Sequence, residues 1–358
     1  MLCIDLDKFA VAKYNNSVYI LVEWEEYIMI NLDMNENKCA EPILLGSKDI
    51  SMSSYPRYLS DTLTKKIAKK LNVNEEVVVL TNGIDEGIYL FCKYVSKCGW
   101  TMLVDIPNYI GIQEAINATD VNAVFIKQCK DYDYEKTIDF LKIHKEIKAV
   151  YLANPRNPFG DYLGGIERVI SYCADNGVVV FLDEAYIEFC AEDSLESIKL
   201  LGFDNLIVAR TFSKAYGLAS IRCGYILSSN YSFVNELRKM WQAQPYHISQ
   251  HSLVCALFAL DDEDRLHKSI EKIGKLKNKF YILLDRFSIP YIKTKTNFVC
   301  VKNINGLADY LKVNSINVMP TELFGLKGFI RITIGNDFEM DKLAQLIIAF
   351  GGGNYETV

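Results

Sequence analysis

The chain lacks long apolar runs and basic stretches. No apolar run reaches the roughly 18 residues that a membrane-spanning helix needs. Asp and Glu outnumber Lys and Arg by 45 to 39, which gives a net charge of −6, and no basic stripe interleaved with aromatic residues appears. Acidic residues among the first eight positions oppose a signal peptide. We therefore expect a soluble cytoplasmic protein with neither a membrane nor a nucleic-acid partner.

The sequence also lacks paired cysteines and has only four histidines. Its ten cysteines stand singly, without a Cys-x-x-Cys pair, and we expect them to be reduced and mostly buried. His247 and His251 have helical i,i+4 spacing, but no glutamate follows as it does in the metalloprotease pattern. We therefore expect no metal site.

What the chain does have is a series of short β-branched runs that alternate with helical patterns. With 358 residues, half of them hydrophobic, it is long enough for about two domains. Alternation of this kind predicts an α/β fold, with a mainly parallel sheet covered by helices. The seven candidate strands are 77–80, 101–104, 123–126, 149–152, 178–182, 206–209 and 223–227.

After about Tyr246 the pattern changes to longer helices, the longest over 266–287, followed by strands at 298–301 and 329–332. This change predicts a large domain over residues 49–245 and a smaller α+β domain over residues 246–358. We expect the N-terminal arm, residues 1–48, to return to the smaller domain.

One lysine lies among side chains that bind anions. Thr211 and Ser213 supply hydroxyls just before Lys214, and Arg222 supplies a guanidinium eight residues after it. A lysine that bonds to an aldehyde cofactor needs such donors nearby to hold the cofactor's phosphate. The stretch therefore predicts an anchor for pyridoxal 5'-phosphate, although it also fits an ordinary loop with Lys214 in solvent.

Further polar groups follow two apolar strands. Asp183 comes directly after the run at 178–182, where it can meet a cofactor ring nitrogen, because ligands of parallel sheets bind at the carboxyl ends of the strands. An aspartate there keeps the pyridine protonated and makes the ring an electron sink. Asn157 and Tyr186 can donate to the ring oxygen. Asp183 could instead cap the next helix, and Asn157 could satisfy its own turn.

Together these stretches resemble the fold type I pyridoxal phosphate enzymes, and most closely the histidinol-phosphate aminotransferase-like branch of the class I/II aminotransferases. The resemblance spans nearly all of the chain and implies an aspartate aminotransferase-like fold whose large domain binds the cofactor. Its motifs are Asn35-Glu36-Asn37, Tyr55-Pro56, Asn82 to Glu86, Pro107-Asn108-Tyr109, Asn157 to Gly160, Asp183 to Tyr186, Ser213-Lys214 and Arg331 to Gly335.

The resemblance also implies a role for each matched residue. Lys214 would anchor the cofactor and move a proton between the substrate Cα and the cofactor C4′. Asp183 would pair with the pyridine nitrogen, and Asn157 and Tyr186 with the ring oxygen, while Tyr109 would stack on the ring. The phosphate would be held by the backbone amides of Ile84 and Asp85 together with Thr211, Ser213 and Arg222.

Two further residues extend the implied site. Tyr55 resembles the residue that family members lend to the phosphate of the neighbouring subunit, which implies a homodimer with shared active sites. Arg331 resembles the arginine that holds the far anionic group of the substrate, with Asn157 beside it. On its apolar strand, an unpaired charge would be costly.

Three positions depart from the family pattern. Met319 stands where histidinol-phosphate aminotransferases usually carry a second arginine for the substrate phosphate, so the pocket suits a carboxylate or an apolar tail better. Lys38 replaces a proline, and either contacts substrate or lies in solvent, with solvent favoured. Ile84 replaces a serine, which removes a hydroxyl but keeps the amide.

The sequence therefore predicts an aminotransferase that moves an amino group between an amino acid or amino alcohol, such as histidinol phosphate, and a 2-oxo acid. A decarboxylase or lyase of the threonine-phosphate decarboxylase type is the alternative, because the same cofactor stabilises any carbanion at Cα. Release of carbon dioxide without a need for an oxo acid would favour that alternative. A non-catalytic protein of the same fold would have lost the cofactor residues, which are all present.

Overall fold

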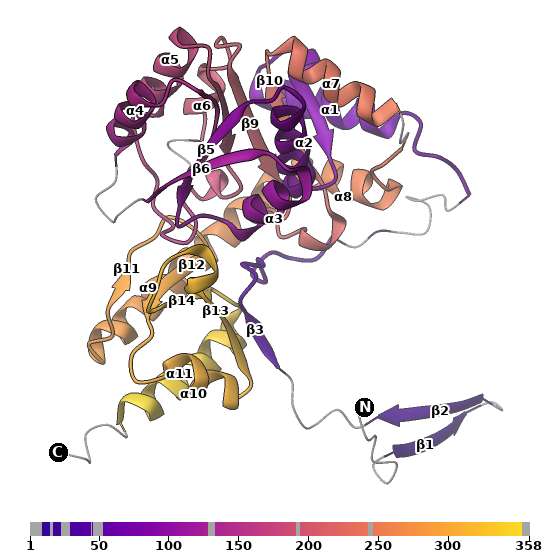
Figure 1. Cartoon of the computed structure of the whole chain (residues 1–358). Coiled ribbons are helices and arrows are strands. Elements are labelled where there is room, and N and C mark those ends of the chain that lie inside the picture. Colours follow the sequence, from indigo (N-terminus) through magenta and orange to yellow (C-terminus); the bar gives the residue numbers. More distant parts are fainter. Residues whose placement is uncertain are drawn as a thin grey trace.

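The computed structural model describes residues 9–14, 17–22, 29–43, 45, 53–127, 133–190, 194–242 and 246–352. These residues form two layered bodies, each built on a β-sheet, which lie one above the other in Figure 1. Strands β1 (Phe9–Tyr14) and β2 (Ser17–Val22) pair as an antiparallel hairpin that lies apart from both bodies. Within these ranges, no helix combines the length and apolar character needed to cross a membrane.

The larger sheet confirms the predicted fold class. In the described part of the chain it has seven strands in the order β4, β10, β9, β8, β7, β5, β6, and β10 alone runs against its neighbours. Each strand overlaps one of the seven predicted runs. Their bounds are β4 (Val78–Thr81), β5 (Thr101–Ile106), β6 (Asn122–Lys127), β7 (Ile147–Ala153), β8 (Val179–Asp183), β9 (Leu206–Thr211) and β10 (Gly224–Ser228).

Helices cover both faces of this sheet, which explains why its central strands are apolar without interruption. Successive side chains of a strand point to opposite faces. Thus Val180 and Leu182 of β8 pack into one core, and Val179 and Phe181 pack into the other. The first face is covered by α1 (Leu59–Leu71), α4 (Tyr134–Ile143), α5 (Ile166–Asp175), α6 (Glu196–Lys199) and α8 (Gln250–Asp261), and the second by α2 (Ile84–Lys97), α3 (Ile110–Thr119) and α7 (Tyr231–Gln242).

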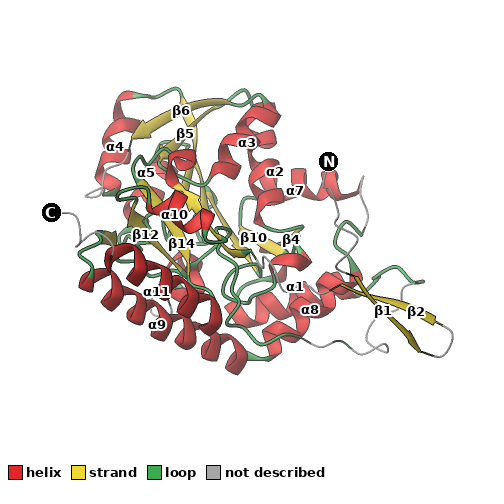
Figure 2. Cartoon of the chain, turned by 90° about the horizontal axis from the view of Figure 1, so that it is seen from below, coloured by secondary structure: helices red, strands yellow, loops and turns green. Residues whose placement is uncertain are grey.

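The smaller sheet combines a strand of the N-terminal arm with strands from the C-terminal part of the chain. Its strand order is β11 (Tyr291–Ile292), β12 (Phe298–Lys302), β14 (Phe329–Thr333), β13 (Ile316–Pro320) and β3 (Ile30–Leu32), and β3 pairs in parallel with β13. Helices α9 (Glu263–Arg286), α10 (Leu307–Val313) and α11 (Asp337–Gly352) belong to the same body, and α9 and α11 lie side by side in Figure 2. Short 3-10 turns occur at η2 (Glu75–Val77), η3 (Ile187–Phe189), η4 (Ala219–Ile221) and η5 (Thr321–Phe324).

Helices α8 and α9 connect the two bodies. Leu253 and Leu260 of α8 are buried in the core of the larger sheet. Leu266 of α9 lies in that core too, whereas Ile273 and Leu284 of the same helix lie in the core of the smaller sheet. The division at residue 246 therefore stays a prediction, and we propose that the boundary lies within α9.

Candidate active site

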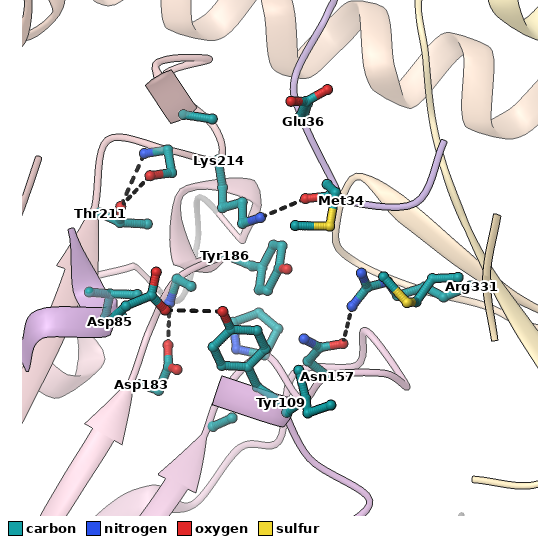
Figure 3. A pocket seen from close by; sticks show the side chains of 18 of the residues that line it. Met34, Glu36, Asp85, Tyr109, Asn157, Asp183, Tyr186, Thr211, Lys214 and Arg331 are labelled. Carbon is teal, nitrogen blue, oxygen red and sulfur yellow. Dashed lines mark hydrogen bonds between the residues drawn. The ribbon is translucent and has the colours of Figure 1, made fainter. Parts of the chain in front are cut away.

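The carboxyl edge of the larger sheet brings the predicted polar residues together. Strands β4, β5, β7, β8 and β9 end at this edge, and the antiparallel β10 begins there at Gly224. The turns at the edge line a cavity of about 420 Å³. Met34 of the arm and Phe324 of the smaller body line the same cavity, so it lies where the two bodies meet (Figure 3).

Every predicted site residue except Tyr55 lines this cavity. These residues are Ile84, Asp85, Tyr109, Asn157, Asp183, Tyr186, Thr211, Ser213, Lys214, Arg222 and Arg331. Tyr55 instead lies at the surface, where 71% of it is exposed, and its ring stacks on Tyr246 with the centroids 5.0 Å apart.

Asp183 ends β8 and is held by two hydrogen bonds. Its Oδ1 accepts from the backbone N of Ala185 at 3.0 Å, and its Oδ2 accepts from the hydroxyl of Tyr151, on the adjacent β7, at 2.5 Å. Burial raises the pKa of Asp183 to about 6, and both hydrogen bonds oppose this rise. Burial also raises the pKa of Tyr151 well above its ordinary value, so its hydroxyl stays a donor. The buried carboxylate suits a partner that brings positive charge.

Lys214 follows β9 and is half-buried in the cavity wall. Its Nζ donates to the backbone O of Met34 at 2.9 Å and lies 5.7 Å from the centroid of the Tyr186 ring. The arm stabilises the loop after Lys214, because Asn37 Nδ2 donates to the backbone O of Ala215 at 2.8 Å. The position of this amine in the cavity wall favours the anchor over the ordinary-loop alternative, in which the amine lies in solvent.

The start of α2 forms an anion-binding corner with Arg222. The guanidinium donates to Ser213 Oγ at 3.2 Å and to Asp85 Oδ2 at 2.8 Å. Gly83 precedes the helix with φ +79°, and a Cβ there would lie 2.6 Å from Arg222 Nη2. Glycine thus leaves room for Arg222 beside the first amides of α2. These amides and the helix dipole both favour a bound phosphate. Thr211 completes the corner, with its Oγ1 3.0 Å from Ser213 Oγ.

Two tyrosines and an asparagine line the middle of the cavity. The Tyr109 hydroxyl donates to Asp85 Oδ1 at 3.0 Å, and burial together with Asp85 raises the pKa of Tyr109. The Tyr186 hydroxyl accepts from Asn35 Nδ2 at 2.8 Å. Asn157 Oδ1 accepts from Arg331 rather than from its own turn. Figure 3 shows these side chains pointing toward the same space as Lys214.

Arg331 is a buried cation that the described residues leave without a carboxylate partner. It is 4% exposed, and it donates to Asn157 Oδ1 at 2.8 Å and to the backbone O of Asp33 at 2.7 Å. The rings of Phe298 and Phe324 flank it, with centroids 5.4 and 4.8 Å from Cζ. Its buried Nε has no hydrogen-bond partner among the described residues. Since burial lowers the pKa of Arg331, an anion in the cavity would stabilise its charge.

The arm segment ties the two bodies together beside the cavity. Asn35 is fully buried, its backbone N donates to Thr333 Oγ1 at 3.0 Å, and its side chain reaches Tyr186. We expected Lys38 to lie in solvent or, as the alternative, to contact substrate. The structure instead places it in an ion pair. Its Nζ pairs with Glu339 Oε1 at 2.7 Å, and the residue does not line the cavity.

Sequence reasoning missed several residues of the site, among them Tyr151, Met34 and Phe324. Tyr151 carries a weak signal, because it is the single polar side chain in the aliphatic run 149–152. Met34 and Phe324 carry no signal, since only the folded chain brings them to the cavity.

The residues present fit pyridoxal 5'-phosphate. They offer an amine at Lys214, a buried carboxylate at Asp183 and an anion-binding corner that a Cβ at Gly83 would fill. On a mainly parallel sheet covered by helices, this combination defines a pyridoxal phosphate-dependent enzyme of the aspartate aminotransferase fold.

Comparison with known proteins gives the family. Residues 28–347 match the model of aminotransferase class I and II, and the chain belongs to this family of pyridoxal phosphate-dependent aminotransferases. It is 30% identical to a histidinol-phosphate aminotransferase of Pyrococcus furiosus over 331 residues, which cover 89% of this chain and 91% of that protein.

Solved structures agree with this assignment. The histidinol-phosphate aminotransferase of Sinorhizobium meliloti in complex with pyridoxal 5'-phosphate has a TM-score of 0.78 at 25% identity, covering 90% of this chain and 92% of that one. The L-threonine-O-3-phosphate decarboxylase of Porphyromonas gingivalis has a TM-score of 0.70 at 20% identity, covering 90% and 99%. The second likeness shows a common fold alone. This chain is therefore an aminotransferase, and the decarboxylase alternative is the weaker one.

Proposed function

We propose that this aminotransferase takes an amino group from an amino acid or amino alcohol and returns it to a 2-oxo acid in the same cavity. One observation carries the proposal: Lys214, Asp183 and Arg331 line a single cavity, although Lys214 follows β9, Asp183 ends β8 and Arg331 lies on β14 of the smaller body. An amine, a buried carboxylate and an unpaired cation are the groups that the cofactor and an anionic substrate require. The kinetics are then ping-pong, because both substrates use one site in turn.

Pyridoxal phosphate, when bound, withdraws electrons from the Cα of an attached amine. Asp183 then holds a proton on the ring nitrogen, which its hydrogen bond from Tyr151 supports because that bond favours the ionised carboxylate. Asn157 and Tyr186 would hold the ring oxygen, and Tyr109 would stack on the ring. The amides of Ile84 and Asp85 with Thr211, Ser213 and Arg222 hold the phosphate.

Lys214 has two tasks in this proposal. It would hold the cofactor, and its Nζ, when free, would act as the acid–base group that takes up and returns the proton at the substrate Cα. Its position supports the second task, since Lys214 lines the same cavity as Arg331. Arg331, with Asn157, binds the anionic group of the substrate and fixes which bond at Cα faces the lysine.

We also propose a homodimer with shared active sites, in a reducing compartment such as the cytoplasm. The exposed ring of Tyr55, outside its own cavity, supports a role at the site of a second subunit. Five buried cysteines that form no disulfide among the described residues, Cys92, Cys173, Cys223, Cys255 and Cys300, support the compartment.

The test is to load the purified enzyme with cofactor, add single amino donors, and follow the visible absorbance. We expect one class of donors to convert the lysine-bound cofactor to its aminated form, and a 2-oxo acid to reverse the change. Lys214→Ala should bind cofactor without the covalent absorbance band and should not exchange amino groups. Carbon dioxide release without any aminated cofactor would favour decarboxylation, and near-normal turnover by Lys214→Ala would refute the assigned role.

A further inference from the structure

The cations that line the cavity are few, and two of them have other tasks. Among the described lining residues they are Lys214, Arg222 and Arg331. Arg222 lies at the phosphate corner, bound to Ser213 and paired with Asp85. Lys214 is the anchor in the proposed function. Among the described lining residues, Arg331 is therefore the one cation left for the substrate.

Arg331 can bind one anionic group of a substrate and not a second one. Two of its nitrogens are already used by Asn157 and by the backbone of Asp33, and Phe298 and Phe324 cover its flanks. The guanidinium can therefore meet a substrate only along its open edge in the cavity. A planar carboxylate suits such an edge, because it accepts from neighbouring N–H groups of one guanidinium.

The wall beside Arg331 is apolar. Met319 of β13 is the register partner of Arg331 on β14, so its side chain stands next to the guanidinium on the same face of the sheet. Met34, Ile110 and Phe324 line the same cavity. Thioether and aromatic surfaces accept an apolar side chain readily, and they supply no donor for a second anion.

The remaining charge in this part of the cavity has the wrong sign for a second anionic group. Glu36 of the arm lines the cavity, and its carboxylate lies 3.9 Å from Lys38 Nζ, whose shorter contact is to Glu339. A substrate with a phosphate or a second carboxylate would have to bring that charge into a site with one cation and a nearby acid.

We propose that the amino donor of this enzyme is an amino acid with a single carboxylate and an apolar side chain, and that Met319 is the residue that sets this preference. This inference rests on the proposed function. The carboxylate binds Arg331, and the side chain packs against Met319, Met34 and Phe324. The matching acceptors are 2-oxo acids with apolar side chains.

The first test measures the single-turnover rate at which donors convert the bound cofactor to its aminated form, divided by their dissociation constants. The panel contains leucine, methionine and phenylalanine against glutamate and histidinol phosphate. We expect the apolar donors to be favoured by about tenfold or more, since an unpaired charge in such a site costs at least that factor. Equal or better use of glutamate or histidinol phosphate would overturn the inference and leave the aminotransferase itself intact.

The two proposals fail in different ways. If no donor on the panel aminates the cofactor, although the covalent absorbance band is present, the proposed function fails. If donors with a second anionic group aminate it as well as apolar donors do, only the preference fails.

Variants at Met319 give an independent check. Met319→Arg should improve use of histidinol phosphate relative to leucine by about tenfold, because it restores a second donor for the phosphate. Met319→Leu is the matched control and should leave the ratio unchanged. A parallel thermal unfolding measurement identifies a variant that has lost its fold. If a variant is unfolded, the donor panel with the unchanged enzyme still tests the proposed preference.

Discussion

The hydrogen bond between Tyr151 and Asp183 shows how a single residue sets the charge of this site. Burial drives the Asp183 carboxyl toward its neutral form and raises its pKa to about 6. The Tyr151 hydroxyl, 2.5 Å away, favours the ionised form that a protonated ring nitrogen needs. Tyr151 does not line the cavity. It is a positioning residue that acts through Asp183.

We predict that Tyr151→Phe raises the pKa of Asp183 further above about 6. The cofactor should then bind about tenfold more weakly at neutral pH, because a hydrogen bond to a charged group contributes roughly 1.5–3 kcal/mol. The measurement is the dissociation constant of pyridoxal phosphate across pH. In the variant, the loss of affinity on acidification should begin at a higher pH.

Tyr94→Phe provides the control for that experiment. Tyr94 is a buried tyrosine of the same core but lies on α2, and it should leave the pH profile of cofactor binding in place. If Tyr151→Phe weakened binding equally at every pH, Tyr151 would be a packing residue only.

Gly83 is the second residue whose type the site dictates. We predict that Gly83→Ala weakens pyridoxal phosphate binding by about tenfold, because the new Cβ would meet Arg222 and the positive φ adds strain of about 1 kcal/mol or more. Pyridoxal, which lacks the phosphate, should bind nearly as before. Competition titrations with the two compounds measure the difference.

Gly164→Ala is the matched control, because a Cβ at Gly164 meets nothing within 4 Å. Its affinity for both compounds should equal that of the unchanged protein. An equal loss of pyridoxal and pyridoxal phosphate affinity in Gly83→Ala would place the damage outside the phosphate corner.

At the scale of elements, the larger sheet was predictable because its central strands are buried on both faces. Val180 and Leu182 face one core and Val179 and Phe181 the other, so β8 appears as an unbroken apolar run. Strands as short as β3 and β11 give no comparable pattern, and their pairing depends on contacts that span the chain.

The same distinction separates the site residues that were predictable from those that were not. Asp183 and Lys214 follow apolar strands directly, so a local pattern and the geometry of parallel sheets suffice to bring them together. Met34 and Phe324 lie in segments that reach the cavity only through the packing of the two bodies. The ion pair of Lys38 with Glu339 is equally non-local, which is why a position in solvent was the wrong expectation.

The connection from β8 to η3 carries a buried charge cluster behind the site. Arg210 Nε donates to Glu184 Oε2 at 2.8 Å, and Glu188 is close enough for Arg210 to lower its pKa. Burial nevertheless raises the pKa of Glu188 to about 7, and its enclosed Oε2 has no hydrogen-bond partner among the described residues. Between pH 4.5 and about 7, the folded state therefore keeps Glu188 protonated to a greater extent than the unfolded chain does.

We predict that the stability contributed by Glu188 falls as pH rises from its unfolded pKa of 4.5 through its folded pKa of about 7. Glu188→Gln removes this titration. It should raise the melting temperature at pH 8 by about 2 °C or more and change it little at pH 5. Thermal unfolding at the two pH values measures the effect.

Glu184→Gln, which changes the ion-pair partner of the same Arg210, should have the opposite effect on stability. It removes the partner of a buried cation, so it should lower stability at both pH values, by about 3 kcal/mol or more. If Glu188→Gln also destabilised the protein at pH 8, the ionised Glu188 would stabilise the fold as a partner of Arg210 instead of destabilising it.

At the scale of the whole molecule, the cavity lies between two bodies that the arm holds together. Asn35 bonds to Thr333 of the smaller body and to Tyr186 of the larger one. Asn37 bonds to the loop that follows Lys214 and to Ser269 of α9. The arm is therefore part of the site, although it lies far from the anchor lysine in sequence.

Aromatic residues are exposed outside this cavity. Tyr55 and Tyr58 are 71% and 77% exposed, and Tyr246 stacks on Tyr55. Exposed tyrosines of this kind are enriched at protein interfaces, where a ring supplies contact area and its hydroxyl a hydrogen bond. They support the proposed homodimer, for which light scattering should give a mass of twice 40.8 kDa.

The sharpest test of shared sites mixes two defective variants, Lys214→Ala and Tyr55→Ala, at a cofactor concentration that leaves each alone nearly inactive. If Tyr55 serves the partner's cavity, a mixed dimer has one site with both defects and one site with neither. After dissociation and random reassociation, half of the dimers are mixed, so activity should rise to about a quarter of that of the unchanged enzyme. If Tyr55 serves its own subunit, each site of a mixed dimer has one defect, and activity should stay at the level of the separate variants. Mixing Lys214→Ala with Arg331→Ala is the control, because both residues line the same cavity of one chain and no site can recover.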